Sequence, residues 1–261
     1  MNNYETLGYV VKDRVATISL NRPDDANGMN LALTTELALV AKECSENAEI
    51  KAVILTGTGK FFCAGGDVRA MYESETSAGD TVKAIADQLH IAISIFERMR
   101  APLIAAVNGV AAGAGFSIAV AADMVIASDK AKFTLAYSKI GLSPDGSSSY
   151  FLPRLIGLRK ARELMFTNRV LSAEEAEQWG LINQVVPHDQ LEEQTQALAQ
   201  SFVNGSLNAN AAIKQLLVAS FSNDLETQMN LESDTIRDSA NAADGTEGVA
   251  SFVEKRAPEF S

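Results

Sequence analysis

PLIAAVNGVAAGAGFS, residues 102–117, predicts a buried strand that runs through a glycine-rich turn into a helix of small residues. The first N–H groups of a helix have no partner within the helix, and the aligned peptide dipoles add partial positive charge there. An oxygen atom that becomes negative is stabilised at such a place. We therefore expect the chemistry of this chain at the junction of strand and helix.

A second glycine-rich loop, FFCAGGD at 61–67, follows another apolar run at 52–55. This loop can bring a second backbone N–H to the same oxygen, and two such donors make an oxyanion hole. Cys63 lies in the loop, which raises the alternative of a cysteine nucleophile. Neither histidine stands in a sequence relation that marks a Cys/His pair, so we expect Cys63 to be a small buried apolar residue.

The uncharged segment 101–122 is long enough to span a membrane. Pro102, Asn108 and three glycines interrupt it, and alanine, its commonest residue, contributes little free energy of transfer into lipid. A strand covered on both faces, followed by a tightly packed helix, has the same composition. The sequence therefore favours a buried strand and helix over a membrane span.

Composition narrows the class of protein. The 261 residues are 47% apolar, enough for one large domain or for a core with a small appendage. A net charge of -11 argues against nucleic acid or an anionic membrane as the main partner, so an anionic substrate needs local basic groups. The sequence has only two cysteines and lacks the charged and then apolar N-terminal pattern of a secretory signal peptide. We therefore expect a reduced, cytoplasmic protein without a disulfide. No metal site is expected, because no set of ligands has zinc spacing.

Strands and helices are predicted to alternate at first, whereas the chain after His188 is predicted to be helical to its end. Besides the strand quoted above, the expected strands lie at 15–20, 51–56, 124–127 and 132–134. The expected helices include 30–47, 81–100, 224–238 and 245–256, with a polar loop over 73–80. Ser172 to Glu175 fits a capping box at a helix start. This order indicates an α/β core followed by a helical C-terminal part.

Six blocks of sequence, in a fixed order, resemble the crotonase (enoyl-CoA hydratase/isomerase) superfamily. They are NRP at 21–23, FCAGGD at 62–67, residues 102–115, KIGLSPDG at 139–146, SAEEA at 172–176 and FVEKR at 252–256. The resemblance implies the crotonase fold, with a spiral of ββα units over 1–200 and a helical region over 201–261 that forms a homotrimer, often a dimer of trimers. It also implies an acyl-CoA thioester substrate, with coenzyme A as part of the substrate and no permanently bound cofactor.

By this resemblance, the backbone N–H groups of Gly66 and Ala114 form the oxyanion hole for the thioester oxygen. Many members have glycine at the second position, but an N–H is all that the role requires. Removing a proton next to a thioester builds an enolate, and fixed N–H donors stabilise its charge. The alternative for Ala114 is a purely structural residue, closely packed at a helix start.

The chain departs from the enoyl-CoA hydratases that it resembles at two positions. Hydratases carry two glutamates where this chain has Ser117 and Tyr137. Adding water to a double bond requires one group to deprotonate the water and another to protonate the neighbouring carbon, work that two carboxylates normally share. The sequence therefore disfavours ordinary hydratase activity.

Asp145 is a carboxylate that remains at a suggestive position. Superfamily members with a similar segment, including the phenylacetate-pathway epoxide and enoyl-CoA isomerases, use an aspartate there. One aspartate can take a proton from C2 and return a proton at C4, which moves a double bond from the 3 to the 2 position. The competing interpretation is structural, since an aspartate between proline and glycine before a helix is a good turn or N-cap residue.

His90 and Tyr137 raise a rival reaction. The aromatic dehalogenases of the superfamily, which hydrolyse 4-chlorobenzoyl-CoA, pair an aspartate at the position of Asp145 with a histidine at a place like His90 and a tryptophan at that of Tyr137. Asp145 would attack the ring carbon, and His90 would activate water to release the aryl ester. A lone helical histidine is more often structural, and Tyr137 can equally be a wall of the acyl pocket.

Isomerisation through Asp145 is the reaction that we expect first, ahead of a dehalogenase-like hydrolysis and of hydration. A further alternative is that the protein is not an enzyme but an oligomer that binds acyl-CoA without turnover. The two missing glutamates suggest this alternative.

Recognition of coenzyme A is expected along the second glycine loop. The resemblance places Ala64, Gly65, Asp67 and Val68 along the adenine and pantetheine path, Arg22 and Ala26 beside it, and Lys255 at a phosphate from a neighbouring subunit. Arg22 and Lys255 would supply the local positive charge that an acidic chain needs to bind phosphate. Their alternative role is that of ordinary surface cations.

Overall fold

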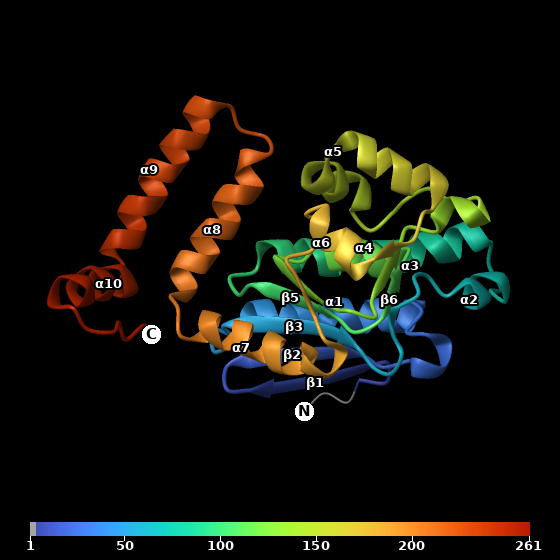
Figure 1. Cartoon of the computed structure of the whole chain (residues 1–261), viewed down its shortest axis with the longest axis horizontal. Coiled ribbons are helices and arrows are strands. Elements are labelled where there is room, and N and C mark those ends of the chain that lie inside the picture. The colour runs from blue at the N-terminus through green and yellow to red at the C-terminus, as the bar shows by residue number, and fades with distance from the viewer. Residues whose placement is uncertain (1–3) are drawn as a thin grey trace.

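Two sheets form the centre of the computed structural model, which describes residues 4–261 (Figure 1). The larger sheet has the strand order β1 (Leu7–Lys12), β2 (Val15–Leu20), β3 (Ala52–Gly57), β5 (Leu103–Val107), β7 (Met124–Ser128) and β10 (Gln184–Val186). The smaller sheet has the order β4 (Phe61–Cys63), β6 (Val110–Ala112), β8 (Lys132–Thr134) and β9 (Leu171–Ser172).

From β3 to β8, consecutive strands of the chain enter different sheets. β3, β5 and β7 lie in the larger sheet, and the strands that follow them, β4, β6 and β8, lie in the smaller one. Pairing between these repeats is parallel in both sheets. Helices α2 (Val68–Tyr72) and α3 (Ala78–Arg98) follow β4, and α4 (Ala114–Val120) follows β6. The expected α/β spiral of ββα units is confirmed.

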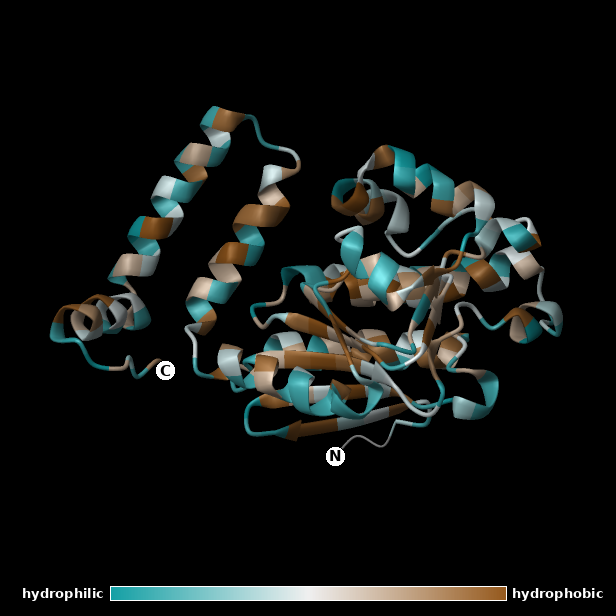
Figure 2. Ribbon diagram, in the orientation of Figure 1, coloured by the Kyte–Doolittle hydropathy of each residue, from teal (hydrophilic) through white to brown (hydrophobic). Residues whose placement is uncertain are grey.

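The larger sheet is covered by apolar residues on both faces. In β3, Val53 and Leu55 belong to the main hydrophobic core, whereas Ala52 and Ile54 pack in a second core with α7 (Leu191–Val203). Parallel strands that are buried on both faces have continuous runs of apolar residues in their sequence, instead of alternating apolar and polar residues. Figure 2 shows these strands as hydrophobic segments enclosed by helices of mixed colour.

The uncharged segment that the sequence predicts to be buried forms β5, β6 and α4. Each residue of α4 is buried. Within residues 4–261, no helix combines the length and the apolarity that crossing a membrane requires.

Helix ends are where the structure differs most from the sequence prediction. α3 begins at Ala78 instead of residue 81, because the Ser77 hydroxyl accepts the N–H of Asp80 and caps the helix. The predicted capping box is confirmed, with Ser172 and Glu175 each accepting the other's backbone N–H.

The remaining helices of the core are α1 (Leu31–Glu46), α5 (Ser148–Thr167), α6 (Ala173–Gln178) and the short 3-10 turns η1 (Pro23–Asp25), η2 (Tyr137–Ile140) and η3 (His188–Gln190).

Helices α8 (Leu207–Ser220), α9 (Leu225–Asn241) and α10 (Ala243–Glu254) extend away from the two sheets as an arm (Figure 1). α9 and α10 lie where separate helices are predicted, but α9 is longer and α10 begins earlier than expected. The predicted domain boundary after residue 200 falls within α7, which packs on β3, β5 and β7.

Candidate active site

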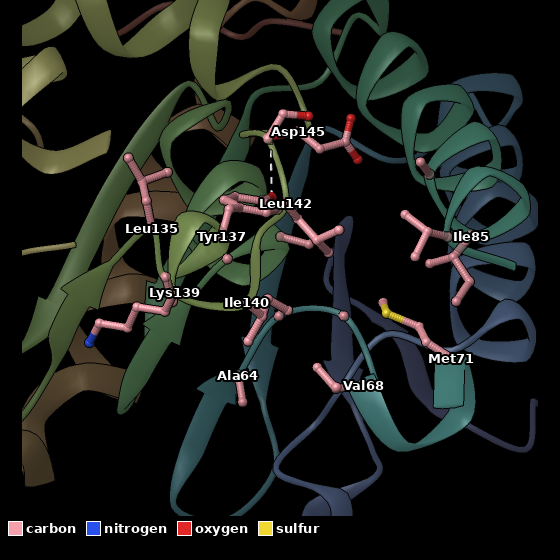
Figure 3. A pocket seen from close by; sticks show the side chains of 18 of the residues that line it. Ala64, Val68, Met71, Ile85, Leu135, Tyr137, Lys139, Ile140, Leu142 and Asp145 are labelled. Atoms are coloured by element: carbon pink, nitrogen blue, oxygen red, sulfur yellow. Dashed lines mark hydrogen bonds between the residues drawn. The ribbon is translucent and has the colours of Figure 1, made fainter. Parts of the chain in front are cut away.

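A cavity of about 420 Å³ lies between the two glycine-rich loops, α2, α3 and the segment that follows β8 (Figure 3). Met71 and Ile85 face Tyr137 and Leu142 across it. Most of the lining is apolar, and Asp145 supplies the one carboxylate among the lining residues of the described chain. The cavity therefore suits an apolar group that meets one carboxylate.

The two glycine-rich loops meet at the bottom of this cavity. Gly65 has a φ of +102° and Gly113 a φ of +50°, conformations that residues with a side chain rarely adopt. A Cβ atom on Gly65 would lie 3.3 Å from the Cα atom of Gly113 and 3.0 Å from the carbonyl oxygen of Ala112. Glycine at both positions thus lets the ends of β4 and β6 approach each other closely.

Two backbone amides are left free where the loops meet. Within residues 4–261, the N–H groups of Gly66 and Ala114 donate to no protein acceptor. Their neighbours are bonded, since the Asp67 N–H donates to Met29 and the Gly113 N–H donates to Thr134. Gly66 and Ala114 both line the cavity. This arrangement can stabilise an oxygen that becomes negative, as the sequence predicts.

Asp145 lies on the same cavity, and its backbone carbonyl is held by three hydroxyl groups. The carbonyl oxygen accepts hydrogen bonds from Ser117 (2.7 Å), Ser148 (2.9 Å) and Tyr137 (3.3 Å). The N-cap of α5 is Ser147, and the Asp145 carboxylate caps no N–H of that helix. The backbone of Asp145 makes the turn, so its side chain is not used as a helix cap.

His90 approaches the Asp145 carboxylate from α3. Its Nε2 atom lies 2.8 Å from Oδ1 of Asp145, although the two residues are 55 positions apart. About half of the His90 side chain and 35% of the Asp145 side chain are exposed. The structure thus brings together the two side chains that the sequence paired only by resemblance.

Ser117 and Tyr137 are the residues that the resemblance places where hydratases carry their two glutamates. Ser117 is fully buried, and its hydroxyl lies 3.1 Å from that of Tyr137. Burial raises the pKa of Tyr137 well above its usual value, so the phenol stays protonated at neutral pH. Neither position can act as a carboxylate base, and both instead contribute to the position of Asp145.

Arg22 and Asp67, both predicted to contact coenzyme A, bind each other in this structure. The guanidinium of Arg22 lies 2.9 Å from the carboxylate of Asp67, and it also binds Asp25 and the carbonyl of Gly28. Burial would raise the pKa of Asp67, but the N–H of Ala70 and the charge of Arg22 together lower it. Arg22 is therefore already neutralised by acidic neighbours, and its contact with a phosphate stays a prediction.

The other residues predicted to bind coenzyme A fall into two groups. Ala64, Gly65 and Val68 line the cavity, and Ala26 lies next to them because its carbonyl accepts the N–H of Ala64. Lys255 ends α10, in the arm, at the opposite end of the molecule from α2 (Figure 1). Within one chain, Lys255 is not brought to the cavity.

The apolar wall supplied by α3 is not predicted from the sequence. Val82, Ile85, Ala86 and Leu89 line the cavity and follow the spacing of one helix face. That spacing is a signal in the sequence, but it does not show which core or cavity the face covers. Lys139 lines the cavity too, from the same block as Asp145.

Cys63 is buried at the base of the second loop, as expected for an apolar residue. Burial raises the pKa of Cys63 to about 12, which keeps the thiol protonated. The geometry therefore argues against the cysteine nucleophile.

Comparison with known proteins agrees with this geometry. Residues 11–261 match the family described as "Enoyl-CoA hydratase/isomerase". The chain is similar to a "1,2-epoxyphenylacetyl-CoA isomerase" of Escherichia coli (strain K12), with 37% identity over 96% of both proteins. It is also similar to a "Probable enoyl-CoA hydratase" of Rhodobacter capsulatus, with 34% identity over 99% of both. Among solved structures, an enoyl-CoA hydratase from Polaromonas sp. JS666 superposes with a TM-score of 0.93 at 31% identity, covering 98% of this chain and 99% of that one.

Proposed function

The chain belongs to the enoyl-CoA hydratase/isomerase family, and we propose that it moves the double bond of an acyl-CoA from the 3 to the 2 position. The observation that carries this proposal is the pairing of one carboxylate with two free amides on one cavity. Hydration normally requires two carboxylates, whereas a double-bond shift requires one. The name of the Escherichia coli relative, an isomerase of an epoxyacyl-CoA, supports isomerisation without specifying a double-bond shift, and the name of the Rhodobacter relative supports hydration.

In the proposed reaction, the thioester oxygen binds between the N–H groups of Gly66 and Ala114. The carboxylate of Asp145 takes one proton from C2, and the electron pair of that C–H bond moves toward the thioester oxygen. The resulting dienolate is stabilised by the two amides, which are already in place when the charge develops. A proton is then returned from Asp145 to C4, which leaves the double bond between C2 and C3.

The test is the conversion of 3-enoyl-CoA to 2-enoyl-CoA, followed by the ultraviolet absorbance of the conjugated thioester. Asp145→Asn keeps the shape of the side chain but removes the base, so we expect kcat to fall by about 10²- to 10⁴-fold. Binding of the acyl-CoA is expected to persist, because the two amides are untouched. Asp87→Asn is the matched control, since Asp87 is an α3 residue paired with Lys83 outside the cavity lining. Full turnover by Asp145→Asn would exclude Asp145 as the base.

Hydration is tested with the same protein by adding 2-enoyl-CoA. Water addition removes the conjugated double bond, so absorbance falls instead of rising. Hydration faster than isomerisation would overturn the proposed reaction, whatever its dependence on Asp145.

A second candidate reaction is favoured by the contact of 2.8 Å between His90 and Asp145. In a dehalogenase-like hydrolysis, Asp145 attacks the halogen-bearing ring carbon, the halide leaves, and His90 activates water to cleave the aryl ester. Release of chloride from 4-chlorobenzoyl-CoA distinguishes this reaction from isomerisation. Tight acyl-CoA binding without turnover of any of these thioesters would instead support a non-catalytic oligomer.

A further inference from the structure

A second cavity, of about 470 Å³, lies between α3, the start of α5 and α8. His90, Ser94, Glu97 and Arg98 line it from α3, and Ser147 contributes from the turn before α5. None of its lining residues lines the first cavity. Ile93, Phe151 and Val218 make part of this lining apolar, but its hydroxyl and charged groups can hold water beside the half-exposed His90.

The contact between His90 and Asp145 joins the two cavities. Asp145 lines the first cavity, His90 lines the second, and their side chains meet at 2.8 Å. The other ring nitrogen of His90, Nδ1, has no partner among residues 4–261. An imidazole with one nitrogen on a carboxylate and the other unbonded, in a half-exposed side chain, is well placed to exchange protons with water.

We propose that His90 exchanges the proton held by Asp145 with water in the second cavity. The proposal rests on the isomerase function proposed above. Once Asp145 has taken the C2 proton, the neutral His90 ring that accepts from it carries its own hydrogen on Nδ1. The O–H bond of Asp145 then breaks and an N–H bond forms at Nε2, which leaves a carboxylate and an imidazolium. Rotamer motion of a half-exposed side chain is fast, so the ring N–H groups exchange with water. Return of a solvent proton from Nε2 restores neutral imidazole and protonated Asp145, which then protonates C4.

In this scheme His90 touches no reacting atom. It acts through Asp145, as a positioning residue that exchanges the proton carried by the Asp145 carboxylate. Without exchange, Asp145 would carry the same hydrogen from C2 to C4. The origin of the hydrogen at C4 therefore reports on His90, whereas the rate of isomerisation reports mainly on Asp145.

The experiment is turnover of unlabelled 3-enoyl-CoA in D₂O, with early product analysed for deuterium at C4. The unmodified protein is expected to place solvent deuterium at C4 in most turnovers. The glutamine of His90→Gln can keep a polar contact with Asp145 but cannot be protonated. We therefore expect the amount of deuterium at C4 per molecule of product to fall by roughly tenfold or more. In that variant, hydrogen from C2 should appear at C4 instead.

Two controls separate proton exchange from a structural role. Asp87→Asn changes a residue of α3 that lies outside both cavity linings, and it should label C4 like the unmodified protein. Addition of imidazole to His90→Ala should restore deuterium at C4. Unchanged labelling in His90→Gln, or direct transfer from C2 to C4 in the unmodified protein, would overturn the proposal while leaving the isomerase function intact. Absence of any isomerisation would refute the proposed function, and the exchange role would fall with it.

Discussion

Asp145 is positioned through its backbone carbonyl, which leaves its carboxylate to the cavity. Three hydroxyl groups bind the carbonyl oxygen, and two of them belong to Ser117 and Tyr137. A comparison by position alone suggests that these residues mark a lost active site, because two glutamates are missing. The contacts give them a different role: they hold the remaining carboxylate where the two free amides can share a substrate with it.

Asp67 shows how a single ionisable residue links stability to pH. Its carboxylate caps α2 by accepting the N–H of Ala70, and it pairs with Arg22. Because the pKa of Asp67 is lower in the folded protein than in the unfolded chain, the charged form stabilises the fold. That contribution is present above the unfolded pKa and is lost as pH falls through the folded pKa.

Asp67→Asn is therefore expected to lower the free energy of unfolding by about 1–2 kcal/mol at neutral pH. Asparagine still caps α2, but it carries no charge for Arg22. The difference from the unmodified protein should shrink as pH falls from about 4 through the lower folded pKa, because Asp67 becomes protonated over that range. Denaturant unfolding at a series of pH values measures this difference in the free energy of unfolding. Asp24→Asn, at an exposed position, is the control. A difference that persists unchanged in acid would contradict the role of the ion pair.

At the scale of elements, the site depends on the contact between α4 and the end of β4. A Cβ atom on Gly115 would lie 2.6 Å from the Cβ of Cys63 and would also clash with the carbonyl of Cys63. Gly115 follows Ala114 directly, so this contact fixes the start of α4 and with it one of the two free amides. The absence of a side chain at Gly115 is thus a condition for joining the two loops.

Gly115→Ala is expected to destabilise the protein by about 1–3 kcal/mol, the usual cost of overpacking a core. Isomerase activity should fall as well, since the Ala114 amide shifts with the start of α4. Gly79→Ala in α3 is the matched control, because its nearest contact would be at 3.8 Å. Thermal unfolding and the 3-enoyl-CoA assay measure both effects. Equal stability of the two variants would show that α4 can move away from β4 without cost.

Element prediction from sequence succeeded where the signal is local. Apolar runs predict β3, β5 and β7, and the Ser172 capping box predicts the start of α6. The start of α3 was placed too late, although Ser77 and Asp80 have the spacing of a helix cap. Their polar surroundings resemble a loop, and only the hydrogen bond of Ser77 shows that the helix has begun.

The whole molecule has a two-sheet core and an arm with apolar side chains on its surface. Among these side chains are Leu225, Ile236, Phe252 and Val253, all well exposed in the single chain. Apolar surface on this scale usually marks a protein interface. It supports the expected homotrimer, or dimer of trimers, in which Lys255 of one chain would approach the cavity of another.

Sedimentation is therefore expected to give a mass of at least about three times the chain mass. Val253→Lys, at a position 75% exposed in α10, should shift the protein toward monomer by placing a charge in the interface. Val10→Lys is the matched control, since Val10 is 62% exposed but lies in β1, outside the arm. A monomeric unmodified protein, or equal assembly of both variants, would contradict this use of the arm.

Much of this protein follows from the order of its amino acids. The strand and helix repeats and the two glycine-rich loops depend on short patterns, because apolar periodicity and glycine at tight turns act over a few residues. The choice of Asp145 came from the resemblance to the family, since the residues around it fit a turn equally well. Tertiary packing alone determined that the amides of Gly66 and Ala114 stay unbonded and that His90 reaches Asp145 across 55 positions. Cavities and long-range contacts arise where separate elements meet, and no local pattern records which faces will meet.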